Sequence, residues 1–209
     1  MNLIGLLGFA GSGKDTVGNM FIEAGYEKVS FAATLKDATA CIFGWDRSLL
    51  EGDTKESREW RDVPDEYWTE KLGYTITPRY ALQLMGTEAC RNTLGEDIWV
   101  YSLLKSLDTT KKYIITDVRF PNEIKMIREV FGTIIRVRRG EEPEWYDTAL
   151  IQNKELSRID MMKKSYPNVH FSEWAWIGTE PDYLIKNDST MEVLKHKVEM
   201  VRQFIEKPL

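Results

Sequence analysis

The sequence predicts an α/β fold in which a phosphate-binding loop joins the first strand to the first helix. An apolar run at positions 3–7 is typical of a buried strand. The segment Gly8-Phe9-Ala10-Gly11-Ser12-Gly13-Lys14 follows it directly, and apolar residues then recur at helical spacing from Val17 to Ala24. Strand, glycine-rich turn with Gly-x4-Gly-Lys, and helix form the structural context that a phosphate-binding loop requires.

The loop residues are suited to hold an oligophosphate. Glycines let successive backbone N–H groups point inward, where a Cβ would obstruct the ligand, and the helix N-terminus adds free donors. Gly11, Ser12 and Gly13 are therefore candidate ligands for ATP phosphates, and Lys14 can reach the β- and γ-phosphates. Ser or Thr normally follows this lysine and holds magnesium, whereas this chain has Asp15 and then Thr16.

Further strands and helices alternate along the chain, as in a parallel sheet covered by helices. The apolar patterns predict strands at 26–31, 112–116, 133–137 and 183–186. They predict helices at 32–43, 97–107, 122–131 and 148–164, and a last helix that follows Asn187. Asn122 is expected to cap the helix that begins there.

One predicted helix combines a core face with a candidate ligand face. Thr77-Pro78 is a cap followed by proline at the first helical position. Helical spacing places Leu82, Met85 and Ala89 on a core face, and Arg79, Gln83 and Thr87 on another, with Glu88 beside it. A guanidinium, an amide and a hydroxyl suit a nucleobase and a phosphate, and an ordinary solvated face is the alternative. Lys36, in the first turn of the 32–43 helix, has the same two interpretations.

Charged residues follow the predicted strands at 112–116 and 133–137. Asp117 and Arg119 are two apart and are expected to project together, so that the acid manages magnesium and the arginine clamps a phosphate. A structural Asp–Arg pair is the alternative. Arg136, Arg138 and Arg139 would repel one another without anions, which makes them candidates for contacts to the γ-phosphate or the transition state.

Two stretches dense in charges and aromatic residues interrupt the α/β pattern. Residues 44–76 are expected to form a cap within a single domain spanning 1–209, and residues 139–178 a lid that carries Arg139 and Arg158. The first stretch has weak periodicity, and the second contains the predicted helix over 148–164.

The composition limits the functions that the chain can have. The net charge of −5 disfavours a nucleic-acid polymer or an acidic membrane as partner, because such binding needs a basic face. Two cysteines among apolar neighbours predict buried, reduced thiols. The N-terminus does not have the pattern of a secretory leader and no apolar run is long enough to cross a membrane, so we expect a cytoplasmic protein.

Several motifs together resemble the deoxynucleoside monophosphate kinases of tailed bacteriophages, which are adenylate-kinase-like P-loop kinases. These are the phosphate-binding loop with Asp15-Thr16, Phe43-Gly-Trp-Asp-Arg47, Thr77-Pro-Arg79, Leu82-Gln-x-x-Gly-Thr-Glu88, Asp117-Val-Arg-Phe-Pro-Asn-Glu123 and His170-x-Ser-Glu173. They occur in order over nearly the whole chain.

The resemblance implies a three-layer α/β fold with a five-stranded parallel sheet, a nucleotide-binding cap and a lid. It implies ATP-dependent phosphorylation of a deoxynucleoside monophosphate with Mg²⁺, often by a homodimer, in the host cytoplasm if the chain is phage-encoded. On this interpretation Lys14, Asp117, Arg119 and Arg138 are catalytic, Asp15 or Asp117 manages the metal directly or through water, and Asn187 neighbours the adenine. The acceptor is expected to contact Lys36, Arg79, Gln83, Thr87, Glu88 and Arg119.

Two other functions remain compatible with the sequence. One is a different small-molecule kinase of the same fold, acting on phosphomevalonate or dephospho-coenzyme A. The other is a nucleotide-dependent switch without an acceptor, which would need a group that orients water. The basic residues beyond the loop favour a second phosphate-bearing ligand.

Overall fold

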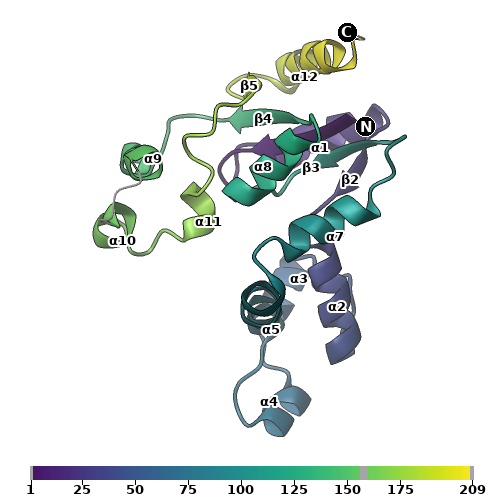
Figure 1. The fold of residues 1–209 in the computed structure, drawn as a ribbon, viewed down its shortest axis with the longest axis vertical. Coiled ribbons are helices and arrows are strands. Elements are labelled where there is room, and N and C mark those ends of the chain that lie inside the picture. The colour runs from purple at the N-terminus through teal and green to yellow at the C-terminus, as the bar shows by residue number, and fades with distance from the viewer. Residues whose placement is uncertain (1, 156–159, 208–209) are drawn as a thin grey trace. The chain divides into compact units, whose positions relative to one another are not determined.

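The structure is a computed structural model that describes residues 2–155 and 160–207. The chain folds as two compact units (Figure 1). One unit combines residues 1–30 with 107–209, and the other comprises Phe31–Ser106. Arg158, expected in the lid, lies outside the described residues.

The first unit is built on a five-stranded, all-parallel sheet with strand order β2-β3-β1-β4-β5. The strands are β1 (Asn2–Leu7), β2 (Glu27–Val29), β3 (Lys112–Ile115), β4 (Thr133–Arg138) and β5 (Tyr183–Lys186). The central strand β1 pairs with β3 on one side and with β4 on the other, so Gly5 lies opposite both Ile115 and Ile134. All five strands occur where the apolar patterns predict them, and this confirms the α/β class.

Helices cover both faces of this sheet and make three layers. Ile4 and Leu6 of β1 belong to a buried cluster with Val17 and Phe21 of α1 (Lys14–Glu23). The same cluster includes residues of α12 (Met191–Glu206). Gly5 faces the other way, since a Cβ there would lie 2.6 Å from Ile127 of α8 (Pro121–Glu129). Because successive strand residues point to opposite faces, α8 lies on the side opposite α1 and α12 (Figure 1).

Three short helices lie between β4 and β5 in the chain. They are α9 (Tyr146–Glu155), α10 (Met161–Ser165) and α11 (Phe171–Trp174). Ala149, Met162 and the run from Trp174 to Ile177 are buried here. The expected continuous helix over 148–164 is therefore two helices, with residues 156–159 outside the described part of the chain.

The second unit is helical. It contains α2 (Ala33–Phe43), α3 (Lys55–Trp60), α4 (Glu66–Leu72), α5 (Pro78–Gln83), the π-helix η1 (Leu84–Arg91), α6 (Asn92–Leu94) and α7 (Ile98–Ser106). Tryptophans anchor the charged stretch that the sequence singles out. The indole N–H of Trp45 donates to Asp65 at 2.7 Å, and that of Trp68 donates to the carbonyl of Phe43 at 2.9 Å.

The expected core face of the helix that begins at Pro78 was partly wrong. Ala81 and Gly86 are buried, whereas Ala89 is exposed. The reason is the π-helix, whose wider turn changes the angular position of every residue after Gln83 relative to an α-helix. Gly86 is placed against Leu35, and a Cβ there would approach the Leu35 side chain to 3.0 Å.

The burial of Phe21 predicts its contribution to stability. Phe21 is 0% exposed in the core of the sheet unit, whereas Phe131, after α8, is 95% exposed. Phe21→Ala is expected to lower the free energy of unfolding by about 3–5 kcal/mol, because it removes a ring and leaves a cavity. The matched Phe131→Ala should change it by less than about 0.5 kcal/mol. Urea unfolding followed by circular dichroism compares the two, and equal losses would contradict this packing.

Candidate active site

The glycine-rich loop has the backbone conformation that a phosphate nest requires. Gly8, Gly11 and Gly13 have φ values of 147°, 77° and 100°, in the region that favours glycine. A Cβ on Gly8 would lie 2.3 Å from the carbonyl oxygen of Val137, and one on Gly13 would lie 2.4 Å from Asn187 Nδ2. The loop is therefore packed between β4 and the end of β5, and α1 begins directly after it at Lys14.

Lys14 is held at the loop. Its Nζ donates to the carbonyl oxygens of Gly8 and Phe9 at 2.7 and 2.9 Å. Burial, and then the nearby charge of Arg119, lower the pKa of Lys14, while Asp15 and Glu173 act in the opposite direction. An added anion would favour the charged form of this amine, because it would offset both the lost hydration and the repulsion from Arg119.

The two acids proposed for metal binding have different surroundings. Asp15 is exposed, and its carboxylate lies 3.6 Å from Lys28 Nζ. Asp117 follows β3, is half-buried and accepts a hydrogen bond of 2.6 Å from the hydroxyl of Ser30. No group of three or more His, Cys, Asp or Glu side chains among the described residues could by itself hold a metal ion. The carboxylates of Asp15 and Asp117 fit a magnesium ion whose other ligands are substrate phosphates and water. Mg²⁺ commonly uses one or two carboxylates in this way.

The segment between β3 and α8 is held by a buried acid that the sequence analysis did not single out. Glu123 is 4% exposed, and its Oε2 accepts from the backbone N–H groups of Arg119 and Phe120 at 2.7 and 3.0 Å. The expectation that Asn122 caps this helix was wrong. α8 begins at Pro121, and Glu123 occupies its third position, where a carboxylate can reach back to free N–H groups. Proline followed two residues later by glutamate was the available signal.

Arg119 and Asp117 have different partners, and Val118 is buried between them. Arg119 Nη1 donates to Ser172 Oγ at 3.3 Å and to Glu173 Oε1 at 3.1 Å. Two residues of α11 therefore contact a predicted site residue, although His170-x-Ser-Glu173 is a weak motif when taken by itself. The backbone N–H of Ser172 donates to Nδ1 of His170, whose side chain caps the start of α11.

Two of the three arginines at the end of β4 share one carboxylate of the chain, which lowers their mutual repulsion; their expected contacts to phosphates stay a prediction. Arg136 Nη2 and Arg138 Nε lie 2.6 and 3.2 Å from Glu142 Oε1. The Arg136 guanidinium also lies 5.2 Å from the ring centroid of Tyr146 and 5.1 Å from that of Trp176. Arg136 therefore ties β4 to α9 and to the segment after α11, while Arg138 and Arg139 line the cavity described next.

A cavity of about 370 Å³ lies against the glycine-rich loop. Its apolar wall includes Phe9, Pro143 and Trp145, and its charged lining includes Arg138, Arg139, Glu141, Glu142 and Glu173. Phe9 packs against Trp145 and Trp176, with ring centroids 5.3 and 5.0 Å away. Aromatic surface beside a phosphate nest and two arginines suits a nucleotide.

Asn187, after β5, bonds the phosphate-binding loop. Its side-chain amide donates to the carbonyl of Ser12 at 2.9 Å, and its backbone N–H donates to the carbonyl of Arg138 at 2.7 Å. The structure thus links Asn187 to the phosphate-binding loop. Its expected position beside an adenine stays a prediction.

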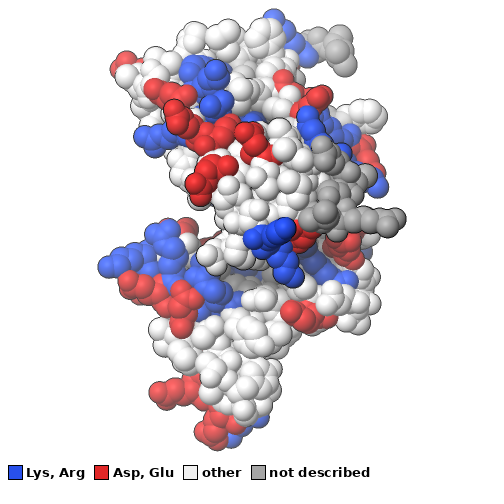
Figure 2. Space-filling view, turned by 90° about the vertical axis from the view of Figure 1, so that its left-hand side faces the viewer, with Lys and Arg blue, Asp and Glu red and all other residues white. Residues whose placement is uncertain are grey.

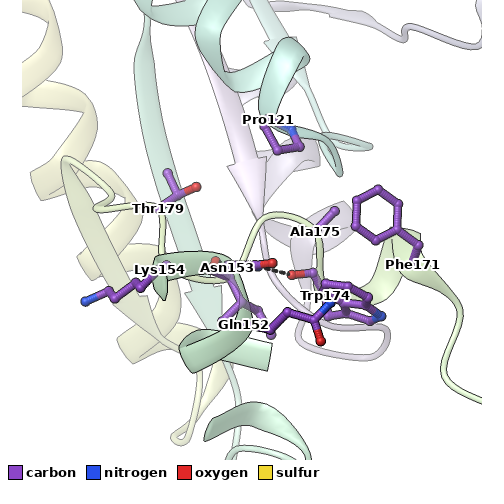
Figure 3. Close-up of a pocket in the computed structure, with 10 residues that line it drawn as sticks. Pro121, Gln152, Asn153, Lys154, Phe171, Trp174, Ala175 and Thr179 are labelled. Atoms are coloured by element: carbon purple, nitrogen blue, oxygen red, sulfur yellow. Dashed lines mark hydrogen bonds between the residues drawn. The ribbon is translucent and has the colours of Figure 1, made fainter. Parts of the chain in front are cut away.

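A second cavity of the sheet unit, about 510 Å³, lies between α9 and α11 (Figure 3). Gln152, Asn153 and Lys154 line one side, and Phe171 and Trp174 line the other. The Asn153 amide donates to the carbonyls of Trp174 and Ile177 at 2.9 and 2.8 Å. These bonds fix the end of α11 against α9.

The residues predicted for the acceptor, except Arg119, belong to the helical unit. Arg79 pairs with Asp62 through Nε and Nη2, which holds the pKa of Arg79 above its usual value, and Lys36 Nζ pairs with Glu51 at 2.6 Å. Gln83, Thr87 and Glu88 are exposed. Thr87 and Glu88 lie in η1, so the expected single face through Arg79, Gln83 and Thr87 does not follow α-helical geometry. Short π-helical segments often occur at functional sites.

Charges of both signs are interspersed on the surface. Among the described residues on the face that Figure 2 shows, Lys and Arg stand beside Asp and Glu. Exposed ion pairs of the sheet unit include Lys111–Glu27 and Arg128–Asp182. None of the described helices is both long and apolar enough to cross a membrane.

The fold and the loop define a P-loop protein of the α/β class. A protein of Acanthamoeba polyphaga mimivirus that is named as a deoxynucleotide monophosphate kinase is 31% identical to the chain. The match covers 76% of the chain and 92% of that protein. The deoxynucleoside-5′-monophosphate kinase of Escherichia phage T5 is also 31% identical, over 61% of the chain and 72% of that protein. The chain belongs to the deoxynucleoside monophosphate kinase family.

Other comparisons are less specific. No protein-family model matches the chain. Among solved structures, a shikimate kinase from Aquifex aeolicus aligns with a TM-score of 0.43 at 14% identity, over 97% of this chain and 96% of that one. A dephospho-CoA kinase from Campylobacter jejuni aligns with a TM-score of 0.40 at 16% identity, over 99% and 98% of the two chains.

Two glycines of the loop should differ in their tolerance of a side chain. Gly8→Ala places a Cβ against the Val137 carbonyl, whereas nothing lies within 4 Å of the corresponding position at Gly11. We expect Gly8→Ala to lower the free energy of unfolding by about 3 kcal/mol, through backbone strain and overpacking. Gly11→Ala should lower it by about 1 kcal/mol, through strain alone. Chemical denaturation measures both, and a Gly8→Ala variant as stable as Gly11→Ala would disprove the close approach to β4.

Proposed function

We propose that this chain transfers the γ-phosphoryl group of ATP to the 5′-phosphate of a deoxynucleoside monophosphate, giving ADP and a deoxynucleoside diphosphate. The observation that carries the proposal is the position of two cations at the carboxyl edge of the sheet: Lys14 bonds the carbonyls of the glycine-rich loop, and Arg119, after β3, bonds Glu173, which lines the cavity beside that loop. One cation follows the phosphate nest and the other follows the neighbouring strand. Together they suit two phosphate groups, one from each substrate. Membership of the kinase family supports the same activity.

The ATP side consists of the loop and its neighbours. Gly11, Ser12 and Gly13 would bind the phosphates through backbone N–H groups, and Lys14 would leave the Gly8 and Phe9 carbonyls to bind the β- and γ-phosphates. Thr16 would lie near the α-phosphate, and Asn187 near the adenine. Mg²⁺ supplies charge neutralisation on the transferred group when it is bound, and Asp117 or Asp15 would hold it directly or through water.

The acceptor side needs no strong general base, because the attacking oxygen of a phosphate is already anionic. Arg119 would hold the acceptor phosphate, with Lys36 and Arg79 as further cations. Gln83, Thr87 and Glu88 are exposed polar groups of the kind that bind a base or a sugar. Residues 44–76 would act as the cap for this nucleotide. Catalysis would then consist of positioning and of neutralising charge on the phosphoryl group in flight.

Residues 139–178 would act as the lid. Arg138 and Arg139 line the cavity beside the loop and would close over the phosphates together with Arg158. Closure would exclude water, which would otherwise accept the phosphoryl group. A homodimer, a cytoplasmic location and the lack of a nucleic-acid partner stay predictions.

A substrate panel tests the proposed function. The full chain with ATP and Mg²⁺ is expected to convert one or more of the four deoxynucleoside monophosphates to the diphosphate, measured by chromatography. Ribonucleotides, phosphomevalonate and dephospho-coenzyme A serve as competing acceptors. Faster turnover of phosphomevalonate or dephospho-coenzyme A would assign a different kinase, and ATP consumption without any acceptor would assign a switch.

Lys14→Ala is expected to reduce phosphoryl transfer on the order of 10³-fold, because it removes the cation that stabilises the transferring group. The matched control is Lys125→Ala, which removes an exposed lysine of α8 paired with Glu129. Initial rates of diphosphate formation compare the variants, with circular dichroism to check the fold. A Lys14→Ala enzyme with the rate of the Lys125→Ala enzyme would rule out the central assignment.

Arg119→Ala is expected to raise the KM for the acceptor by about tenfold or more, the effect of losing one charge-assisted contact. The KM for ATP should change less. Arg128→Ala serves as the control, because Arg128 lies on α8 and pairs with Asp182. An acceptor KM that stays at the wild-type value in Arg119→Ala would contradict the proposed role of Arg119.

A further inference from the structure

Glu173 places a carboxylate inside the cavity that borders the phosphate-binding loop. It lines this cavity together with Phe9, Ala10, Gly11 and Ser12. Its Oε1 lies 3.1 Å from Arg119 Nη1, and the neighbouring Ser172 hydroxyl accepts from the same nitrogen at 3.3 Å. A carboxylate of the chain therefore bonds Arg119 at the border of this cavity.

Lys14 is held in a different way. Its Nζ donates to the neutral carbonyl oxygens of Gly8 and Phe9 at 2.7 and 2.9 Å. Of the two cations proposed as phosphate ligands, Arg119 is therefore the one that bonds Glu173 directly.

A bound phosphate and the Glu173 carboxylate would compete for the same positive charge. Two anions a few Å apart repel each other, most strongly where protein excludes water. A phosphate dianion also offers Arg119 more charge and more acceptor oxygens than a single carboxylate. Phosphate binding at Arg119 is therefore stronger when Glu173 gives up this contact.

We propose that Glu173 is a placeholder anion: it holds Arg119 until a substrate phosphate arrives and is then displaced. This inference rests on the proposed role of Arg119 as a phosphate ligand. Glu173 is a positioning residue on this view. It keeps Arg119 in place at the expense of affinity for phosphate.

The local structure allows Glu173 to move without unfolding its surroundings. The chain after it is anchored, because Trp174 to Ile177 are buried and Asn153 holds the carbonyls of Trp174 and Ile177. Figure 3 shows the bond from the Asn153 amide to the backbone of Trp174, whereas Phe171, two residues before Glu173, is exposed. Glu173 itself is partly exposed, so its side chain can turn toward solvent.

The experiment measures binding of inorganic tripolyphosphate to the full chain by calorimetry. Glu173→Gln keeps the size of the side chain and removes its charge, and it is expected to lower the Kd by about fivefold to tenfold. The matched control is Glu141→Gln, which removes a carboxylate that lines the same cavity but does not bond Arg119. The control should lower the Kd by less than about twofold. An unchanged or higher Kd in Glu173→Gln, or an equal decrease in both variants, would overturn the proposal.

A double-mutant cycle locates the effect at Arg119. In an Arg119→Ala background, Glu173→Gln should change the Kd for tripolyphosphate by less than about twofold, since the contact that the carboxylate blocks is gone. A full fivefold to tenfold gain in that background would show that Glu173 acts through another group and would overturn the proposal.

This test separates the inference from the proposed function, because binding of tripolyphosphate needs no acceptor and no turnover. Tighter binding in Glu173→Gln together with inactivity toward every acceptor would remove the proposed function alone. Phosphorylation of a deoxynucleotide by the wild-type chain, with no gain in Glu173→Gln, would remove the placeholder role alone.

Discussion

The close packing of the glycine-rich loop between β4 and the end of β5 is the constraint on which the site depends. Gly8 lies so near the Val137 carbonyl that a side chain has no room, and Asn187 holds the loop from the end of β5. All five strands run in parallel, so their carboxyl ends meet at one edge. Lys14, Asp117, Arg138 and Asn187 come from four different strand ends and are brought to this edge by the sheet alone.

Aromatic contacts connect this edge to the segment proposed as the lid. Phe9, within the loop, contacts Trp145, Tyr146 and Trp176. Arg136 lies over two of the same rings and pairs with Glu142. A displacement of α9 or of the chain after α11 would therefore change the environment of Phe9, which gives the lid a direct physical connection to the loop that binds ATP in the proposed mechanism.

Intramolecular carboxylates explain how an acidic chain can offer several cations to phosphates. Arg119 pairs with Glu173, Arg138 with Glu142, Arg79 with Asp62 and Lys36 with Glu51. Each pair lowers the repulsion that exposed cations would otherwise exert on one another, and in the proposed mechanism each would exchange its carboxylate for a substrate phosphate. The net charge of −5 is compatible with anion binding for this reason, because local pairing and not overall charge sets the field at the site.

The sequence by itself determined the strands, the loop and the candidate cations, because apolar period, glycine spacing and residue type are local properties. The sequence did not reveal that η1 is a π-helix, that Glu123 rather than Asn122 holds the start of α8, or that Glu142 pairs with both Arg136 and Arg138. Only the tertiary structure determined which carboxylate forms an ion pair with which cation. Glu173 lies 54 residues from Arg119 along the chain, and no local pattern encodes a contact that forms only when the sheet and α11 are both in place.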